Sequence, residues 1–289
     1  MNIVNDKRFD ACPLCKSEKI VYLSDIEYYS PIQFSTLNIS LEFKPTLWKC
    51  SCCKSWFTQN IVREEIALEL YTQGSSADKW PRKAIEQTKT KDVLAVLHKL
   101  YRRGLQVLDI GCNTGELLDF ARGRGALTTG IEVSTVCMNV VRNKGHLFAL
   151  SIEETSDNYF DVITAFDLVE HLYNVPMFLT ACYAKLKSGG SLVILTGDIS
   201  SLSALICRSK WWYLKAPEHI IFPSTLFFKI YSGFRIERVL STYASVEYDE
   251  PFIELVRGVY GGLRRHKYNG IPSLGPDHSL LILRKPEAS

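Results

Sequence analysis

The spacing of hydrophobic and polar positions changes near residue 60. Before this point, short runs of β-type residues at 19–23, 46–49 and 56–57 stand among polar residues, with little helical periodicity. After it, apolar residues recur at helical spacing over residues 61–71, which predicts an amphipathic helix. The pattern therefore predicts a small β-rich unit in the first 60 residues and a different organisation beyond it.

Strands and helices alternate from residue 105 onward, which is typical of a doubly wound parallel sheet. The expected strands lie at residues 106–110, 127–132, 146–150, 160–166 and 191–196, and the expected helices at residues 115–124, 134–143 and 175–186. Ser134 is a suitable N-cap for the second of these helices. Ahead of the sheet, a helix is expected from about Pro81 to Tyr101, because proline suits the first helical turn.

The region after residue 196 is less regular. Helices are expected at residues 199–207 and 224–231, the second capped by Ser224, and strands at residues 233–240 and 278–284. A long segment, residues 243–276, separates the last two strands and includes a weaker helical pattern at residues 251–263. We therefore expect a unit at residues 1–60, a helical linker or lid at residues 61–104, and a main domain at residues 105–289 with an insertion at about 243–276.

Composition adds few constraints. The chain has 289 residues, of which 46% are hydrophobic and 22% charged, as in an ordinary globular protein. The formal net charge of +3 neither favours nor excludes a nucleic-acid partner. The N-terminus has no apolar segment of a signal peptide, and the longest apolar stretch, residues 199–207, is far shorter than the roughly 20 residues of a membrane span. We expect no membrane span and a cytoplasmic location.

A glycine-containing turn follows the first strand of the main domain. Asp109 closes the strand, and Gly111 and Gly115 frame a turn into a helix, where glycines and free backbone N–H groups let a ligand approach closely. A dinucleotide fingerprint does not fit, because Asn113 stands where that motif has its middle glycine, and a P-loop does not fit, because no lysine follows Gly115.

The spacing of this turn resembles motif I of class I S-adenosylmethionine-dependent methyltransferases. Residues 107–115 match its pattern, Glu132 matches the acidic residue that holds the ribose hydroxyls, and residues 160–172 and 186–192 resemble the family's later motifs around strands four and five. The resemblance covers residues 105–196. It implies an α/β, Rossmann-like class I methyltransferase sheet, parallel with an antiparallel C-terminal hairpin, and S-adenosylmethionine as cofactor.

The resemblance also implies which residues line the cofactor site. They follow the ends of the first four strands, with one residue from the preceding helix, and comprise Asp109, Gly111, Cys112, Asn113, Gly115, Glu132, Val133, Ser151, Ile152, Phe166, Asp167, Leu168, His171 and Tyr71. The family often has an aspartate near Ser151 that contacts adenine, and Glu153 could take its place here.

Nine cysteines fall into two groups. Four are scattered through the main domain, while Cys12, Cys15, Cys50 and Cys53 form two C-x-x-C pairs in the first unit. Two such pairs can close a tetrahedral zinc site of four thiolates, which leaves no open position for catalysis, so a structural zinc is expected. Cys52 in place of Cys50 is the alternative ligand. With this module, the chain resembles methyltransferases of sugar nucleotides and surface polysaccharides, and also certain ribosomal RNA methyltransferases.

Methyl transfer to a hydroxyl or a carbon acid needs a base, and histidine suits this role near neutral pH. His171 follows the fourth strand, and His219 follows the fifth, where the acceptor enters; His98, His146, His266 and His278 are read as surface or packing residues. The pair Glu218–His219 resembles an acidic–histidine pair of sugar C-methyltransferases that carry an N-terminal zinc module, although those enzymes have a further C-terminal domain. The expected catalytic residues are therefore His219, His171 and Glu218.

Two other features concern the acceptor. Residues 211–213, Trp-Trp-Tyr, could form an aromatic wall, and the basic cluster at residues 264–267 could bind phosphate. The sequence favours methyl transfer, at oxygen or carbon, to a small-molecule or carbohydrate acceptor. An RNA methyltransferase guided by the zinc module is the alternative, and a non-enzymatic zinc-dependent interaction protein is opposed by the intact turn and Glu132. The oligomeric state is left open.

Overall fold

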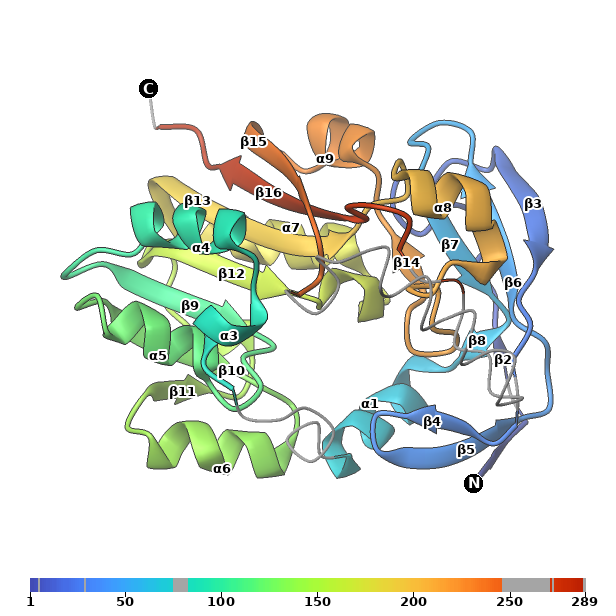
Figure 1. Cartoon of the computed structure of the whole chain (residues 1–289), viewed down its shortest axis with the longest axis horizontal. Coiled ribbons are helices and arrows are strands. Elements are labelled where there is room, and N and C mark those ends of the chain that lie inside the picture. The colour runs from blue at the N-terminus through green and yellow to red at the C-terminus, as the bar shows by residue number, and fades with distance from the viewer. Residues whose placement is uncertain (5, 29, 75–82, 246–270, 272, 288–289) are drawn as a thin grey trace.

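The computed structural model describes residues 1–4, 6–28, 30–74, 83–245, 271 and 273–287. Figure 1 shows two parts side by side: a large sheet flanked by helices, and a group of smaller sheets built mainly from the N-terminal residues. Within the described ranges, no helix is both long and apolar enough to cross a membrane.

The large sheet has the predicted architecture. Its strands are β9 (Gln106–Ile110), β10 (Leu127–Ile131), β11 (Leu147–Ala149), β12 (Phe160–Phe166), β13 (Leu186–Gly197), β15 (Arg235–Thr242) and β16 (His278–Arg284), in the order β11-β10-β9-β12-β13-β16-β15. The first five of these pair in parallel, whereas β16 is antiparallel to both β13 and β15. The prediction of a mostly parallel sheet with an antiparallel C-terminal hairpin is confirmed.

Helices cover both faces of this sheet, because successive residues of a buried strand point to opposite sides. On one face, Val107 and Val162 pack against α4 (Lys91–Leu100) and α5 (Glu116–Arg122). On the other, Leu108 and Ile163 pack against α7 (Val175–Lys185) and α9 (Thr225–Tyr231). Near the β11 edge, α6 (Thr135–Asn143) contributes Val141 to a small apolar cluster. The apolar runs predicted as strands are therefore buried on both sides.

The N-terminal residues form three smaller sheets. The four-stranded sheet has the order β14-β7-β6-β3, the three-stranded sheet has the order β1-β5-β4, and β2 pairs with β8. These strands are β1 (Asn2–Ile3), β2 (Asp6–Lys7), β3 (Ile20–Asp25), β4 (Ile32–Phe34), β5 (Leu37–Leu41), β6 (Thr46–Cys50), β7 (Trp56–Gln59), β8 (Ile61–Val62) and β14 (Ile221–Phe222).

Strand β14 joins the two parts, because it belongs to the main domain but pairs with β7 of the N-terminal unit. Ile221 lies opposite Phe57 and Phe222 opposite Trp56, in antiparallel register. The pairing was not predicted, since two residues are too few to give a recognisable pattern. It places the chain that follows β13 along the edge of the N-terminal sheet (Figure 1).

Ser224 strengthens this junction directly after β14. Its hydroxyl caps α9 by accepting from the backbone N–H of Phe227 at 3.0 Å, which confirms the predicted cap. The same hydroxyl donates to the carbonyl of Cys53, and the Ser224 N–H donates to the Ser55 hydroxyl at 2.9 Å. Ser224 therefore lies just after β14, caps α9 and contacts the turn that contains Cys53.

Two predicted helices are wrong in part. The helix expected over residues 81–101 is divided into α3 (Ile85–Thr88) and α4, and Thr90 between them donates to or accepts from the Thr242 hydroxyl at 2.8 Å. The helix expected over residues 61–71 begins as strand β8, which pairs with β2, and continues as α1 (Glu64–Gln73). In both cases a contact with a distant segment overrides the local periodicity.

Smaller differences occur at two other places. Strand β13 begins at Leu186 rather than at the expected residue 191, and α8 (Leu202–Cys207) is shorter than predicted and continues into the 3₁₀ turn η3 (Arg208–Lys210). The helical pattern at residues 251–263 lies outside the described residues.

Candidate functional site

The turn after β9 adopts a backbone conformation that few residues tolerate. Gly111, Asn113 and Gly115 have φ angles of +73°, +48° and +84°. A Cβ atom on Gly111 would lie 3.2 Å from the Leu168 side chain, so this position is restricted by space as well as by φ. The turn opens directly into α5, and together with the ends of β10 and β12 it forms one edge of the sheet.

Glu132 follows β10 and faces this turn. Its half-buried carboxylate accepts from the N–H of Asn113 at 2.9 Å and from the N–H of Ser134 at 2.9 Å. Each oxygen keeps a free lone pair, so the group can still accept from the hydroxyls of a ligand. Ser134 holds the N-cap position of α6, but the predicted side-chain cap is not formed, because its hydroxyl donates to the carbonyl of Gly74 at 3.0 Å.

Asp109 lies beneath the turn and is only 4% exposed. Its carboxylate accepts from the Thr164 hydroxyl at 2.6 Å. Burial raises the pKa of Asp109 from 3.8 to about 7, although the bond from Thr164 opposes the shift. The structure thus places Asp109 under the loop, where it supports the backbone rather than facing solvent.

The other predicted cofactor residues lie around the edge formed by the turn after β9 and the ends of β10 and β12, and their exposure differs. Cys112 is buried and Val133 is exposed, whereas Phe166 and Leu168 are half-buried. Ser151 and Ile152 lie at the start of the 3₁₀ turn η1 (Ile152–Glu154), and the Ser151 hydroxyl lowers the pKa of Glu153 by hydrogen bonding.

Asp167 directly follows β12 and has a positive φ of +49°. Lys89, from the break between α3 and α4, donates to its Oδ2 at 2.9 Å, and Nε2 of His278 lies 4.0 Å from its Oδ1. Burial opposes ionisation, but the charges of Lys89 and His278 hold the pKa of Asp167 below its usual value. Asp167 is therefore a carboxylate with one oxygen bound by a cation and the other facing an imidazole.

A second cluster forms where the 3₁₀ turn η2 (Val169–His171) meets the segment before β14. One ligand-type atom from each of Glu170, His171 and His219 lies within 4.8 Å of the others, and the two imidazole rings contact edge to face at 4.6 Å. Glu170 is fully buried and accepts from the hydroxyls of Tyr213 and Thr196, and burial raises its pKa. These groups could share a proton or hold a cation.

His219 is buried, and its Nδ1 donates to the carbonyl of Tyr213 at 2.6 Å. Burial, followed by the nearby charges of His171 and Lys215, holds the pKa of His219 well below its usual value. The ring is therefore neutral near pH 7, and Nε2 keeps its lone pair because the proton is on Nδ1.

The N-terminal unit supplies two contacts to this cluster. The hydroxyl of Tyr71, on α1, lies 2.9 Å from Nδ1 of His171, which is also 3.0 Å from the carbonyl of Glu218. The Glu218 carboxylate accepts from the backbone N–H of Ser35. The structure therefore brings the three predicted catalytic residues together with Tyr71, and it assigns the Glu218 side chain to holding the loop.

The sequence interpretation read His278 as a surface or packing residue, and its burial agrees with packing, but the structure also places it beside Asp167 at the candidate site. It opens β16, opposite Gly197 at the end of β13, and is fully buried. Its Nδ1 lies 2.8 Å from Asp277 Oδ1, and among the described residues its Nε2 has no hydrogen-bond partner. An adjacent Asp–His pair at the start of an antiparallel strand was the available signal, since that end meets the carboxyl ends of the parallel strands.

The predicted aromatic wall is built around His278. The Trp212 ring stacks on it with centroids 5.8 Å apart, and the Tyr213 ring contacts it edge to face at 4.5 Å. Trp211 and Trp212 donate their indole N–H groups to Asp277 Oδ2 at 3.0 and 2.6 Å. The aromatic residues thus fix the Asp277–His278 pair, and Trp211 and Tyr213 belong to a buried apolar cluster rather than to an exposed wall. The basic cluster at residues 264–267 and His266 lie outside the described residues.

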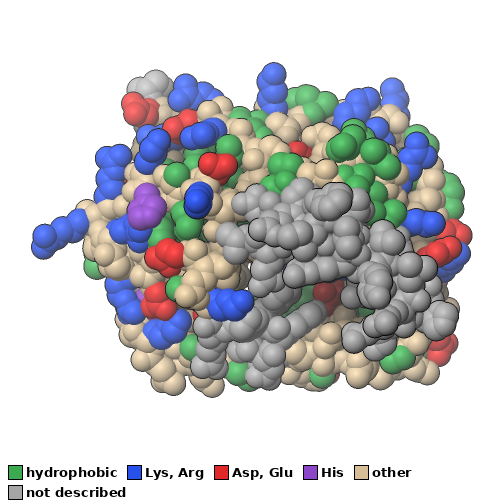
Figure 2. Space-filling view, viewed as in Figure 1, with side chains coloured by type: hydrophobic (Ala, Val, Ile, Leu, Met, Phe, Trp, Pro, Cys, Tyr) green, Lys and Arg blue, Asp and Glu red, His purple; other side chains and the backbone are tan. Residues whose placement is uncertain are grey.

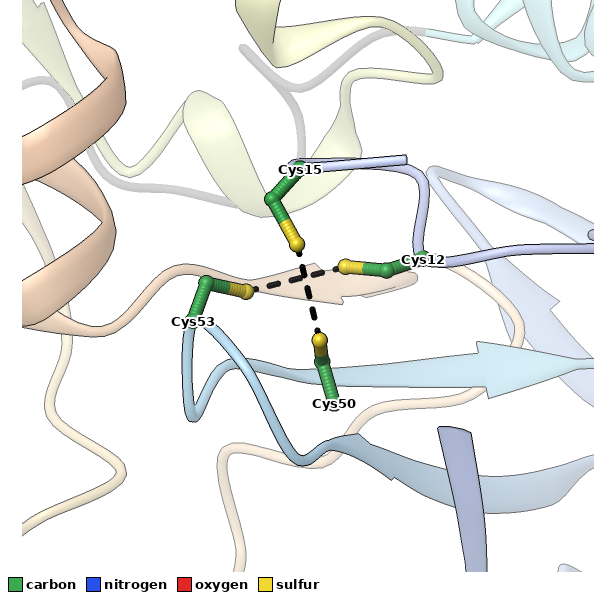
Figure 3. Close-up of side chains that lie close together, drawn as sticks. All are labelled: Cys12, Cys15, Cys50 and Cys53. Atoms are coloured by element: carbon green, nitrogen blue, oxygen red, sulfur yellow. Dashed lines mark hydrogen bonds between the residues drawn. The ribbon is translucent and has the colours of Figure 1, made fainter. Parts of the chain in front are cut away.

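Four cysteine sulfurs converge in the N-terminal unit (Figure 3). The Sγ atoms of Cys12, Cys15, Cys50 and Cys53 all lie within 4.8 Å of one another, with 3.6 Å between Cys12 and Cys53 and 3.5 Å between Cys15 and Cys50. A regular tetrahedral zinc site with Zn–S bonds of about 2.3 Å places its sulfurs roughly 3.8 Å apart. The geometry and the donor set therefore suit zinc.

The surroundings of these cysteines favour thiolate formation at one of them. The hydrogen bond from Cys12 lowers the pKa of Cys53 to about 5, whereas burial raises that of Cys15 to about 11. Cys52, the alternative ligand, is exposed, and its sulfur accepts from the Ser17 hydroxyl at 3.1 Å. The structure brings Cys50 rather than Cys52 into the group.

Comparison with known proteins extends this description. Residues 82–236, more than half of the chain, match a family model described as a methyltransferase domain. The ubiquinone biosynthesis O-methyltransferase of Bradyrhizobium sp. (strain ORS 278) is 36% identical over 101 residues, which are 32% of this chain and 40% of that enzyme. The mitochondrial enzyme of the same name from Rattus norvegicus is 31% identical over 116 residues, covering 36% of this chain and 34% of that enzyme. The match thus spans less than half of either relative.

Solved structures support the fold alone. The cyclase SpnF superposes with a TM-score of 0.50 and 19% identity, covering 68% of this chain and 81% of that chain. The methyltransferase in complex with the Haloferax volcanii Trm112 methyltransferase activator gives a TM-score of 0.50 and 13% identity, covering 68% of this chain and 89% of that chain.

The pKa of Asp109 predicts a pH dependence of stability. Because the folded-state pKa of about 7 lies above the usual aspartate value of 3.8, the folded protein binds this proton more tightly than the unfolded chain. The resulting contribution to stability is complete below pH 4 and is lost as the pH rises through 7. The Asp109→Asn variant should lack this loss, and its stability relative to the wild type should rise by about 1 kcal/mol per pH unit between pH 5 and 7.

Urea unfolding of the ligand-free protein at pH 5, 6 and 7 measures this difference. Asp157→Asn, at a carboxylate that is 67% exposed, is the control and should change little with pH. An Asp109→Asn curve parallel to that of the wild type would show that Asp109 is ionised throughout the range.

Proposed function

Because this chain belongs to the methyltransferase-domain family and is an S-adenosylmethionine-dependent methyltransferase, we propose that it methylates a hydroxyl oxygen of a small-molecule or carbohydrate acceptor. The observation that carries the proposal is the group of imidazole and aromatic rings at the edge of the sheet beside the cofactor turn. The similarity to ubiquinone biosynthesis O-methyltransferases supports oxygen as the target atom.

The residues of the cofactor turn fit S-adenosylmethionine. Glu132 would accept from the two ribose hydroxyls, and Gly111 leaves room where a side chain would crowd Leu168. When bound, the sulfonium supplies an already activated methyl group, so the protein mainly has to orient the acceptor and remove its proton.

The sequence-predicted catalytic residues stay within this proposal. The neutral His219 can accept a hydrogen bond from the acceptor, and His171 and Glu218 hold its loop between α1 and the N-terminal sheets. The charge of His171 and that of Lys215 oppose full protonation of His219, so this residue is better suited to binding the hydroxyl than to keeping its proton.

Methyl transfer to RNA is the second candidate, supported by the four-cysteine group. Figure 2 shows that on this face the Lys and Arg side chains of the described residues are scattered among Asp and Glu rather than gathered in one basic patch. A basic patch would be needed to neutralise a phosphate backbone. We favour the small acceptor because the curated relatives are ubiquinone biosynthesis O-methyltransferases, and we propose a cytoplasmic location for the reaction.

Labelled methyl transfer tests the acceptor class. We expect the wild-type protein to transfer the methyl group of S-adenosylmethionine to at least one hydroxyl probe among catechol, 3,4-dihydroxybenzoate, UDP-glucose and methyl α-D-mannopyranoside. Total RNA with and without ribosomal proteins serves as the competing acceptor. Label found only in RNA would contradict the proposal and establish the second candidate.

Glu132 should determine cofactor affinity. The Glu132→Gln variant keeps the size of the side chain but loses the charge that strengthens hydrogen bonds from the ribose, so the Kd for S-adenosylmethionine should rise about 10- to 100-fold. Isothermal titration calorimetry measures this change, with Glu237→Gln, an exposed position on β15 at the other edge of the sheet, as the control that should alter the Kd by less than about threefold. Equal effects of the two variants would argue against a specific role of Glu132.

The four-cysteine group should hold one structural zinc ion per chain, because four thiolates leave no open coordination position. Mass spectrometry or elemental analysis should find this ion in the wild-type protein. The Cys15→Ser variant should lose the metal and unfold at lower temperature, whereas Cys52→Ser, at the exposed neighbour, should keep both. Full zinc occupancy in Cys15→Ser, or loss of zinc in Cys52→Ser, would show that a different set of ligands binds the metal.

A further inference from the structure

His278 has two features of a general base, a carboxylate beside one ring nitrogen and no described hydrogen-bond partner on the other. It is fully buried at the edge of the sheet where β12 and β13 end, and its Nε2 has no hydrogen-bond partner within the part of the chain that the structure describes. A buried nitrogen without a partner costs folding free energy, which suggests that it serves a ligand.

The protonation of the ring follows from its neighbour. Asp277 is fully buried and its Oδ2 accepts from Trp211, Trp212 and Ser273, while its Oδ1 faces His278 Nδ1 at 2.8 Å. Although burial opposes ionisation, these hydrogen bonds hold the pKa of Asp277 below its usual value. Since an ionised carboxylate can only accept, His278 must donate from Nδ1, and in the neutral ring Nε2 carries the lone pair.

The charges around His278 distinguish it from His219. His278 has Asp277 at Nδ1 and Asp167 Oδ1 4.0 Å from Nε2, so an imidazolium formed there lies between two carboxylates. His219 is next to His171 and Lys215, which both disfavour a positive charge. Lys89, bound to the other oxygen of Asp167, is the nearest opposing charge, and its ion pair with that carboxylate offsets it.

Access to Nε2 leads past Asp167. The side chain of Asp167 is 41% exposed, so its carboxylate connects the buried imidazole with the surface. Tyr213 and Trp212 pack against the ring. Because Nε2 lies 4.0 Å from Asp167 Oδ1, a hydroxyl that binds beside this carboxylate would be close to Nε2.

We propose that His278, oriented by Asp277, accepts the proton of the acceptor hydroxyl during methyl transfer; this rests on the proposed function. The O–H bond breaks as its proton binds Nε2, and an electron pair of the acceptor oxygen forms the new bond to the methyl carbon. The pair of the broken C–S bond stays on sulfur, which leaves a neutral thioether. The imidazolium is stabilised by Asp277 and Asp167 until it releases the proton to solvent.

Nitrogen NMR of the ligand-free protein tests the tautomer without any acceptor. With ¹⁵N-labelled histidine, at a pH where the ring is neutral, His278 should show a protonated Nδ1 and an unprotonated Nε2, and this pair of signals should disappear in His278→Gln. A proton on Nε2 with none on Nδ1 would overturn the proposal.

Kinetics with a probe that the wild type methylates, such as catechol or methyl α-D-mannopyranoside, tests the role in catalysis. His278→Gln should lower kcat about 10²- to 10⁴-fold, the usual contribution of a general base, while the Kd for S-adenosylmethionine changes by less than about twofold. His146→Gln is the matched control, because His146 is also buried beside a carboxylate, Asp119, but lies between α5 and α6. It should retain kcat.

The possible outcomes distinguish a failure of the role of His278 from a failure of the proposed acceptor class. Unchanged kcat in a folded His278→Gln protein, judged by thermal unfolding and by cofactor binding, would overturn the role of His278 and leave the proposed function intact. If the wild type methylates none of the hydroxyl probes, the proposed acceptor class fails, and the NMR result alone decides whether His278 has the protonation that a base requires.

Discussion

The site depends on the pairing of β14 with β7, two residues of backbone that hold the chain after β13 against the N-terminal unit. Without this pairing, the segment that carries Glu218 and His219 would be a long surface loop. The register brings Ser224 onto the carbonyl of Cys53, next to the sulfur group. A metal bound by four cysteines would fix that turn, and through it the position of a histidine far away in the sequence.

In the proposed function, the N-terminal unit has a role that needs no contact with the methyl group. The unit supplies the Ser35 N–H to Glu218, its sheet holds β14, and Tyr71 on the following helix contacts His171. The main domain supplies the cofactor turn and the Asp277–His278 pair at one edge of a single sheet. On this proposal the acceptor site is shared between both parts, which gives the four cysteines at the beginning of the chain a place in the enzyme.

The sheet could be predicted from the sequence because its strands are continuous apolar runs that do not depend on distant partners. The ends of β9, β12 and β16 were predicted to the residue, and the turn was recognised from the spacing of Asp109, Gly111 and Gly115. β14 could not be predicted, since a two-residue strand has no period. His278 was predicted as a surface or packing residue and is buried, but its place beside Asp167 could not be predicted, because the antiparallel β16 puts the first residue of the strand, not the last, at this edge of the sheet. The spacing of the four cysteines predicted a metal site. It did not predict that the turn with Cys53 would contact the segment around Ser224.

The most direct test asks whether the N-terminal unit holds residues 219–224, here called the acceptor segment. It compares hydrogen–deuterium exchange between zinc-loaded and chelator-treated protein. The account predicts that removal of the metal accelerates exchange at residues 219–224 and in β7, while the amides of β12 and β13 in the large sheet keep their protection. Unchanged protection of residues 219–224 after complete removal of the metal would contradict it, because the position of the acceptor segment would then be independent of the four cysteines.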